Sequence, residues 1–400
     1  MSRLVPINEI AKISPSFPKG LKLSQDSLVS FLPMAAVSEN GNIIAQDERR
    51  LGEVSKGYTY FANGDVLMAK ITPCMENGKA TFVENLKHSV GFGSTEFHVL
   101  RPSPEVDGKY LFYMIWNPLF RKIAGRNMTG TAGQKRVPSS FLKDFKIPLP
   151  PLPEQKRIAA ILDKADSIRR KRQEAVRLTE ELLRSVFLDM FGDPVTNPKG
   201  WDRFCLGDVV QKIESGWSPV CDEGQADANE WGVLKLGAVT TCRYLDTESK
   251  ALPADVRPRP ELEVKAGDLL FTRKNTYDLV AASALVYATR PKLMLSDLIF
   301  RLKLKDDSAV ISEYLWALLS STGKRKQIQS LAGGSSGSMP NISKSKLMEQ
   351  MIEVPPMALQ KKYAKILHSN FKIRNKLELA AQSSIHLFNS LLQRAFEGEL

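Results

Sequence analysis

The sequence predicts an α+β protein built as two similar globular units, each followed by a long helix. Residues 147–162 read IPLPPLPEQKRIAAIL and residues 352–367 read IEVPPMALQKKYAKIL, so one segment occurs twice, 205 residues apart (352 − 147). In both copies a proline-rich lead precedes a long polar–apolar pattern, and short strand-like runs mix with helical ones elsewhere. Strands and helices without a regular β-α-β alternation favour an α+β fold. We therefore expect a pseudo-twofold internal repeat.

The repeat reaches well beyond this segment. The run Asn63–Leu67 (NGDVL) matches Ala266–Leu270 (AGDLL) at an offset of 203 residues (267 − 64). Gln155 matches Gln360 at an offset of 205 (360 − 155). Repeats of solenoid proteins are only about 20 to 50 residues long. The longer, slowly drifting offset indicates a duplicated domain with small loop insertions.

Composition and charge favour a globular protein with a polyanionic partner. The 400 residues are 43% hydrophobic and 25% charged, with a net charge of +12. Each Lys or Arg set against a phosphate releases condensed counterions, so this basic surplus favours nucleic acid. No apolar run reaches the roughly 18 residues of a membrane span. The start MSRLVPINEI lacks a signal peptide's apolar core, so the protein is expected in the cytoplasm. The four scattered cysteines favour free buried thiols over zinc ligands.

The duplication divides the chain into a globular unit at 1–150, a helix within 151–192, a second globular unit at 193–355 and a second helix within 356–400. Apolar runs bounded by Gly and Asn predict strands in each unit, and longer periodic runs predict one helix in each. The expected strands are Gly64–Ala69, Glu96–Leu100, Val264–Arg273 and Leu298–Leu304, and the expected helices are Lys109 to about Ala124 and Glu313 to about Leu331.

The two long helices have recognisable ends and seams. Pro153 lies in the first turn, and Gly192-Asp193-Pro194 ends the first helix at about Phe191. Apolar or small residues recur in steps of four and three, the spacing of a coiled coil. Leu162 and Leu182 are 20 residues apart and Leu367 and Leu391 are 24 apart, so the second helix is expected to be about one turn longer. The expected seams are Ile158, Ile161, Ala165, Ile168, Ala175, Leu182 and Val186, with Arg172 and Thr179 interrupting, and Leu359, Tyr363, Ile366, Ile373, Leu377, Ala380, Ser384, Leu387 and Leu391, with Asn370 interrupting.

Chain order fixes the direction of the two helices if they pack together. The second globular unit follows the end of the first helix and precedes the start of the second, so a packed pair must be antiparallel. A helix of roughly 35 residues spans roughly 50 Å, and a DNA duplex repeats every 34 Å or so along one face. Two units held apart on a basic protein suggest two contact sites on one duplex.

These features together resemble the type I restriction-modification specificity subunits. The lead PLPPLPEQKRIAAIL, the helix behind it and the exit Phe191-Gly192-Asp193-Pro194 are similar to that family's central conserved region. The opening of the second unit, Trp201–Pro219, and the run Lys265–Leu270 resemble a target recognition domain, and Leu391–Leu400 resembles the family's usual ending. The resemblance covers essentially the whole chain. The first unit departs from it, because Leu4–Gly20 lacks the tryptophan-led start of the second unit.

The resemblance implies a function and a set of partners. Each globular unit would be a target recognition domain that reads one half of a split site in double-stranded DNA, with the helices setting the spacing. The helices would also dock two adenine-N6 methyltransferase subunits, and motor-nuclease subunits would join to cut unmodified DNA. S-adenosylmethionine, ATP and Mg would be bound by those partners, so no cofactor is expected in this chain.

The chain itself is expected to be non-catalytic. Asn117-Pro118-Leu119-Phe120 is similar to the NPPY/F motif of adenine methyltransferases, but its second proline is Leu and no glycine-rich cofactor loop precedes it. A helix turn is the favoured interpretation. Glu263-Val264-Lys265 lacks the Pro-Asp partner of a nuclease site, and the repeat places it in a turn that enters a strand. The Gly-Lys pairs lack the Ser/Thr and upstream Gly of a phosphate-binding loop.

The Gly/Ser/Thr-rich loops before each proline-rich lead are the candidate DNA contacts. Small residues let the backbone approach a groove, and Gln, Lys and Arg bond base edges or phosphates. A second pair of candidate segments follows the matching strands of the two units. A third basic run, Arg169–Arg172, is expected to be a solvated helix face. The candidates are Thr129, Thr131, Gln134, Lys135, Arg136, Lys70 and Thr72 in the first unit, and Arg273, Lys274, Asn275, Ser335, Ser336, Asn341 and Lys344 in the second.

Two alternatives stay open at this point. One is the specificity module of another restriction system that reads a bipartite site. The other is a coiled-coil scaffold that binds only protein. Sequence-selective retention on DNA, by the complex with its methyltransferase, would distinguish either kind of restriction specificity subunit from the scaffold.

Overall fold

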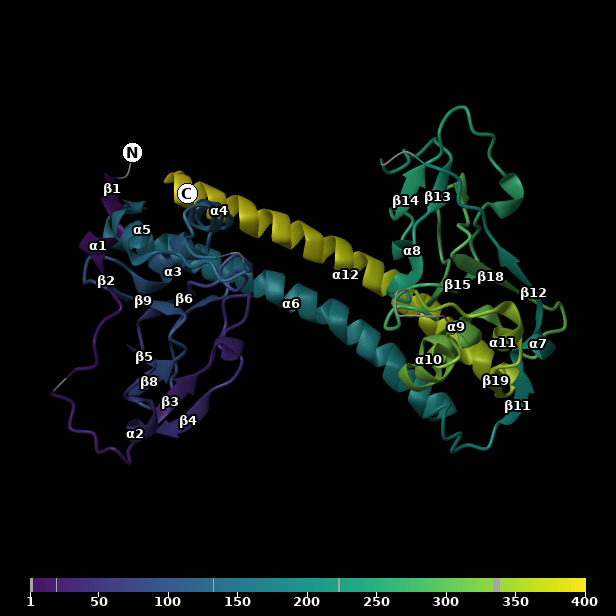
Figure 1. The fold of residues 1–400 in the computed structure, drawn as a ribbon, viewed down its shortest axis with the longest axis horizontal. Helices are drawn as coiled ribbons and strands as arrows, with labels where there is room; N and C mark the ends of the chain where they lie inside the picture. The colour runs from purple at the N-terminus through teal and green to yellow at the C-terminus, as the bar shows by residue number, and fades with distance from the viewer. Residues whose placement is uncertain (1–2, 19, 132, 222–223, 334–338) are drawn as a thin grey trace. The chain divides into compact units, whose positions relative to one another are not determined.

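A computed structural model describes residues 3–18, 20–131, 133–221, 224–333 and 339–400. The chain divides into two compact units. Unit 1 comprises 1–174 and 378–400, and unit 2 comprises 175–377. Mixed sheets and helices occur in both units, which confirms the α+β class (Figure 1). Among the described residues, no helix has the combined length and apolar character needed to cross a membrane.

Unit 1 is built on three small sheets. The central sheet has the order β2-β9-β6-β7, with every neighbouring pair antiparallel. A second sheet has the order β4-β3-β8-β5, and β1 pairs with β10. Short helices fill the connections. The elements are β1 Arg3–Pro6, α1 Ile7–Ile10, β2 Ala11–Ile13, β3 Leu28–Leu32, η1 Met34–Ala36, β4 Asp47–Arg50, α2 Leu51–Val54, β5 Thr59–Ala62, β6 Val66–Ala69, β7 Ala80–Phe82, β8 Val90–Gly93, β9 Phe97–Pro102, α3 Gly108–Trp116, α4 Pro118–Arg126, α5 Ser139–Asp144 and β10 Lys146–Leu149.

Unit 2 repeats the central sheet and the terminal strand pair. Its four-stranded sheet has the order β12-β18-β15-β16, β11 pairs with β19, and a three-stranded sheet has the order β14-β13-β17. The elements are β11 Asp202–Cys205, α7 Leu206–Val209, β12 Val210–Ser215, β13 Gly232–Leu234, α8 Gly237–Thr240, β14 Ser249–Ala251, η2 Pro260–Leu262, β15 Leu269–Thr272, β16 Ser283–Leu285, β17 Leu293–Met294, β18 Ile299–Leu304, α9 Ser312–Ser320, α10 Thr322–Gln329, α11 Lys344–Met348 and β19 Met351–Val354.

Each predicted helix of the globular units is in fact two helices. In unit 1 the break falls at Asn117, whose side chain accepts a hydrogen bond from Leu119 N at 2.8 Å and caps α4. Pro118 then occupies the first helical position, where its missing N–H costs nothing. This confirms the helix-turn interpretation of the Asn117–Phe120 run. In unit 2 the break falls at Ser321, whose backbone is extended. The strand expected at Val264–Arg273 is also shorter, because a turn at Gly267 (φ +91°) precedes β15.

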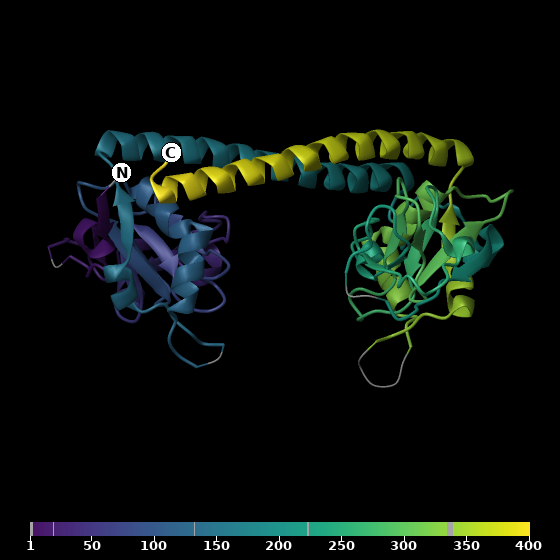
Figure 2. The same cartoon turned by 90° about the horizontal axis from the view of Figure 1, so that it is seen from above.

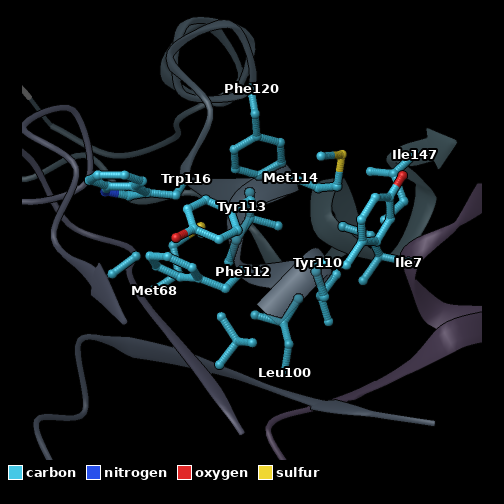
Figure 3. Close-up of a cluster of buried hydrophobic side chains, with 14 of the residues drawn as sticks. Ile7, Met68, Leu100, Tyr110, Phe112, Tyr113, Met114, Trp116, Phe120 and Ile147 are labelled. Atoms are coloured by element: carbon cyan, nitrogen blue, oxygen red, sulfur yellow. The ribbon is translucent and has the colours of Figure 1, made fainter. Parts of the chain in front are cut away.

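Aromatic side chains of α3 and α4 form the centre of the unit 1 core (Figure 3). Tyr110, Phe112, Trp116 and Phe120 are buried, and burial of such rings contributes more than that of any other side chains. Their polar atoms keep partners inside the core: the Tyr110 hydroxyl donates to Pro148 O at 2.7 Å and Trp116 Nε1 donates to Gly78 O at 2.9 Å. Helix α3 is thereby tied to β10 and to the loop before β7.

The duplication is preserved in buried hydrogen bonds. Gln155 Oε1 accepts from Asp107 N at 2.8 Å, and its Nε2 donates to Glu105 O and Pro150 O. Gln360 makes the equivalent three bonds in unit 2, to Ile311 N, Ala309 O and Pro355 O. Both side chains are fully buried. The glutamine found by sequence comparison therefore fastens the start of each long helix to the loop before α3 or α9.

The long helices α6 (Leu152–Phe191) and α12 (Met357–Glu397) contribute to both units. In unit 1, Arg157 donates to Leu400 O at 3.0 Å and Arg172 donates to Ala380 O at 2.8 Å, so the two segments run in opposite directions. The pairs Asn370–Thr179 and Tyr363–Phe187 show the same opposition in unit 2. Figure 2 shows these segments along one side of the sheets of each unit. The helices have 40 and 41 residues, so the expected extra turn in α12 was wrong.

The buried positions of α12 follow steps of four and three and share Tyr363, Asn370 and Ser384 with the expected seam, but the positions between these lie one residue later than expected. Ile373 and Leu387, expected inside, are exposed. Polar residues are among the buried ones, and Asn370 Nδ2 donates to Thr179 O at 3.1 Å. The buried series is Tyr363, Leu367, Asn370, Arg374, Ala381, Ser384 and Phe388.

Candidate nucleic-acid interface

The candidate residues of unit 1 meet at the base of a hairpin. Thr129 and Arg136 pair through N–H···O bonds in both directions, at 2.8 and 2.9 Å. Lys135 O accepts from Thr72 N at 2.9 Å, and Lys70 O accepts from Val137 N at 2.9 Å. The segment after β6 is thereby joined to the hairpin, and the structure brings both predicted clusters of unit 1 together.

The same arrangement is repeated in unit 2. Asn341 and Gly333 exchange N–H···O bonds at 3.0 Å, and Ile342 N donates to Arg273 O at 2.8 Å. Asn275 N donates to Pro340 O at 3.4 Å, as Thr72 N does to Lys135 O in unit 1. The candidates Arg273, Lys274, Asn275 and Asn341 therefore lie together. Ser335 and Ser336 lie outside the described residues.

The candidate side chains differ in how freely they can contact a ligand. Thr129, Thr131, Gln134 and Lys135 are exposed in the hairpin, which Figure 2 shows projecting from unit 1 on the side away from its helical segments. Arg136 is already engaged, because its Nε and Nη2 bond Glu96 at 3.0 and 2.9 Å. That hydrogen-bonded pair holds the pKa of Glu96 below its usual value. Arg136 therefore anchors the hairpin.

In unit 2 an aromatic ring organises the cations. The Arg273 guanidinium lies 5.4 Å and the Lys344 ammonium 5.5 Å from the centre of the Phe300 ring, at the start of β18. Cations over an aromatic face are attracted by its quadrupole. Asn275 is buried and its Oδ1 accepts from Thr276 N at 2.8 Å, so this side chain shapes the turn. Sequence reasoning missed Phe300 because it lies within a strand pattern.

The basic run Arg169–Arg172 is not the solvated face that was expected. Arg169 is buried, bonds Asp166 Oδ1 at 2.9 and 2.6 Å, and lies 5.3 Å from the ring of Phe388. Arg170 also pairs with Asp166. The Arg169–Phe388 contact and the Arg172–Ala380 hydrogen bond join α6 to α12 within unit 1, whereas Lys171 is exposed, so most of this run packs there.

His98 in unit 1 occupies the position of Phe300 in unit 2 (offset 202, 300 − 98) and supports the hairpin base. Its Nε2 donates to Val137 O at 2.8 Å. Burial lowers the pKa of His98 below its usual 6.5, and the Lys70 charge acts in the same direction, against weaker opposing effects of the Val137 carbonyl and Glu96. The folded protein thus prefers neutral His98.

Acidification is expected to loosen the hairpin base of unit 1 selectively. Because the pKa of His98 is lower in the folded than in the unfolded chain, its contribution is fully present above about pH 6.5 and is lost as the pH falls below it. Hydrogen-exchange protection factors of residues 128–137 should drop between pH 7.5 and 5.5 in the wild type. In His98→Phe, which copies unit 2, the drop should be smaller. Equal drops in both proteins would contradict the role of His98.

Among the described residues, no group of three or more His, Cys, Asp or Glu side chains could hold a metal ion. Cys74, Cys205 and Cys242 are free thiols, and all four cysteines, Cys221 included, are half-buried. The edge of unit 1 offers exposed hydroxyls, an amide and the Lys135 ammonium, and the edge of unit 2 offers exposed Lys344 beside half-buried Arg273, Lys274 and Asn341. These are donors suited to phosphates and base edges.

A duplicated α+β chain with an equivalent basic edge in each copy defines a protein with two similar binding units. Comparison with known proteins gives the family. The model of the type I restriction modification DNA specificity domain matches residues 4–178 and 198–385. The Escherichia coli type I restriction enzyme EcoEI specificity subunit is 30% identical, with 98% of this chain and 82% of that protein covered. This chain belongs to that family of specificity subunits.

Other relatives agree. The E. coli EcoKI specificity subunit is 24% identical, with 76% of this chain and 68% of that protein covered. The crystal structure of a type I restriction-modification S subunit from M. genitalium has a TM-score of 0.60 at 13% identity, with 98% of this chain and 96% of that chain covered. A chain from a study of type I R-M complex assembly has a TM-score of 0.54 at 20% identity, with 100% and 98% covered. The two structures support the fold.

Proposed function

We propose that this protein directs a type I restriction-modification complex to a split DNA sequence, with each globular unit reading one half. The observation that carries the proposal is the repeated hairpin base. Lys70 and Arg273 lie at equivalent places, and the carbonyl of each accepts a hydrogen bond from the segment that directly follows the hairpin. Equivalent edges in a duplicated chain suit two half-sites of one duplex. The recognition domains would span 1–150 and 193–355, and the helical regions 151–192 and 356–400.

Methylation and cleavage of DNA would be carried out by partner subunits. Two adenine-N6 methyltransferase subunits would dock on α6 and α12 and bind S-adenosylmethionine, and motor-nuclease subunits would use ATP and Mg. The chain itself is non-catalytic and works in the cytoplasm of a prokaryote. Thr129, Thr131, Gln134 and Lys135, with Lys70 and Thr72, would contact DNA in unit 1. Lys274, Lys344, Asn341, Ser335 and Ser336 would do so in unit 2, where Arg273 and Asn275 shape the edge.

Long-read methylation mapping of the native genome, with and without the gene, tests this function once transcription of the locus is verified. Loss of one split adenine-methylated motif together with the gene is the expected result. Purified complex should then be retained on DNA carrying that motif and not on DNA with either half scrambled. An unchanged methylome, with no selective retention by the complex, would favour a protein scaffold.

The helices are also proposed to act as a ruler between the half-sites, as an antiparallel coiled coil. Deleting Lys171–Glu174 removes one turn of α6, about 6 Å. The spacer of the methylated motif should change by one or two base pairs of about 3.4 Å each. A companion protein that also lacks the repeat-equivalent Lys376–Leu379 keeps the two helices matched in length. An unchanged spacer in an active deletion variant would refute the ruler.

A further inference from the structure

Unit 2 contains an arginine stacked on a tryptophan, and neither residue is among the candidates discussed above. The Arg259 guanidinium is 4.2 Å from the centre of the Trp217 ring, the shortest of the cation–ring distances among the described residues. Arg259 is exposed and Trp217 is half-buried. Within the part of the chain that the structure describes, no carboxylate or carbonyl accepts a hydrogen bond from this guanidinium. Its orientation is thus set by the ring, while its N–H groups stay available.

The backbone holds Trp217 at the same end of the sheet as the candidate edge. Trp217 follows β12, and Arg273 follows β15; both strands pair antiparallel with β18 between them (Figure 1). The two strands therefore end at one edge. Trp217 N donates to Leu295 O at 2.9 Å, and Arg273 N donates to Leu298 O at 3.1 Å, so one turn before β18 joins the two sites.

Local packing fixes the tryptophan still further. A Cβ on Gly216 would lie 2.1 Å from Leu295 O, so only glycine permits this approach of the chain to the turn. On the other side of Trp217, Ser218 is bonded to the same turn. Asp297 N donates to Ser218 Oγ at 3.1 Å, and the serine hydroxyl donates to the Asp297 carboxylate. The stacked pair is thus built on a rigid support next to Arg273.

We propose that Arg259 reads a guanine in the major groove of the half-site that unit 2 recognises, with Trp217 as its positioning residue. A planar guanidinium presents two parallel donors, which match guanine O6 and N7. Stacking on the ring leaves this donor edge pointing outward and removes side-chain freedom before binding. At the equivalent place in unit 1, Phe17, the residue 200 positions before Trp217, packs on Tyr60 and Phe92. The inference rests on the proposed function and concerns one half of the site only.

Methylation mapping of the complex, with this chain in full length and its methyltransferase, tests the assignment. Arg259→Ala and Arg259→Lys should relax one G·C position in one half-site by roughly ten- to a hundredfold in relative methylation rate. The other half-site should keep its specificity, which provides an internal control. Arg259→Met keeps an apolar cover on Trp217, so its unchanged thermal unfolding would separate binding from folding. Trp217→Ala should relax the same position, and Trp217→Phe should restore most of the discrimination.

The possible outcomes distinguish a failure of the proposed function from a failure of the proposed guanine contact. If the wild-type complex methylates no split motif, the proposed function fails. If the wild-type motif is present and the Arg259 variants keep it unchanged, the guanine contact is wrong. A uniform loss of rate at every sequence, without relaxation and with a salt slope reduced by about one, would show a phosphate contact and overturn the base-reading role.

Discussion

Lys324→Met is expected to destabilise unit 2 by about 3–5 kcal/mol, because it leaves a buried carboxylate without its main partner. The Lys324 ammonium lies 2.7 Å from Glu353 Oε2 and donates to Met351 O at 3.1 Å, and both charged side chains are 3% exposed. Arg203, at 3.3 Å from the same carboxylate, is half-exposed and offsets only part of the loss. The pair fastens α10 to β19, directly before the second long helix begins.

Unit 1 supplies the reference for this prediction. Phe120 and Pro148 stand at the repeat-equivalent places (324 − 204 and 353 − 205), so the same junction is apolar there. Replacing a buried ion pair by apolar residues of similar volume is often neutral. The double variant Lys324→Met with Glu353→Leu should therefore recover most of the lost stability.

Denaturant unfolding of the full chain, with hydrogen exchange in β19 and β10, measures the effect in each unit. Protection should fall in β19 of the single variant and stay unchanged in β10. A loss below about 1 kcal/mol in the single variant would show that water already solvates the pair. A double variant as unstable as the single one would show that packing, rather than charge, holds this junction.

Sequence signals predicted the features that are set by residues close together in the chain. The proline-rich leads, Gln155 and Gln360 were found because each copy repeats the same residues, and those residues make the same buried bonds. The break at Asn117 was also visible in principle, since proline follows it. Ser321 carries no comparable signal, because only its extended backbone separates α9 from α10.

Properties that depend on distant partners could not be predicted in this way. The seam of α12 was assigned by hydropathy, which counted Asn370 as an interruption and left out Arg374. Both are buried, and they contact Thr179 and Glu180 of the facing helix. The candidate edges were found where a cation follows a strand, as at Arg273. The stack of Arg259 on Trp217 was missed because 42 residues (259 − 217) separate its members. A tryptophan directly before a Ser-Pro pair was the available signal.

Replacing exposed leucines on the two long helices is expected to have the second large effect, a loss of the proposed methyltransferase docking. Leu182 and Leu387 are repeat-equivalent (offset 205, 387 − 182), and they are 53% and 58% exposed. The equivalent isoleucines, Ile168 and Ile373, are 41% and 55% exposed. Each unit thus presents a repeat-equivalent exposed leucine and isoleucine on its helical segments, besides the further exposed leucines Leu178, Leu188 and Leu379. Exposed apolar positions of this kind suit a surface that binds another helix, and their duplication agrees with the two methyltransferase subunits proposed above.

Leu182→Asp and Leu387→Asp are each expected to weaken the docking of one methyltransferase subunit more than a hundredfold. A carboxylate placed in an apolar interface must lose its hydration without gaining a partner, which costs several kcal/mol. Native mass spectrometry of co-expressed complexes should then show one methyltransferase subunit bound to each single variant and none bound to the double variant. Folding of the chain should be unaffected, because both leucines are exposed.

Asn389→Asp provides the matched control, because it adds the same charge to an exposed position on the other side of α12, about 200° around the helix from Leu387. This variant should bind both methyltransferase subunits. If the double aspartate variant also binds two subunits with wild-type affinity, the exposed apolar positions do not form the docking surface. If Asn389→Asp loses a subunit as well, added negative charge rather than loss of apolar contact is the cause, since the two variants share only the charge.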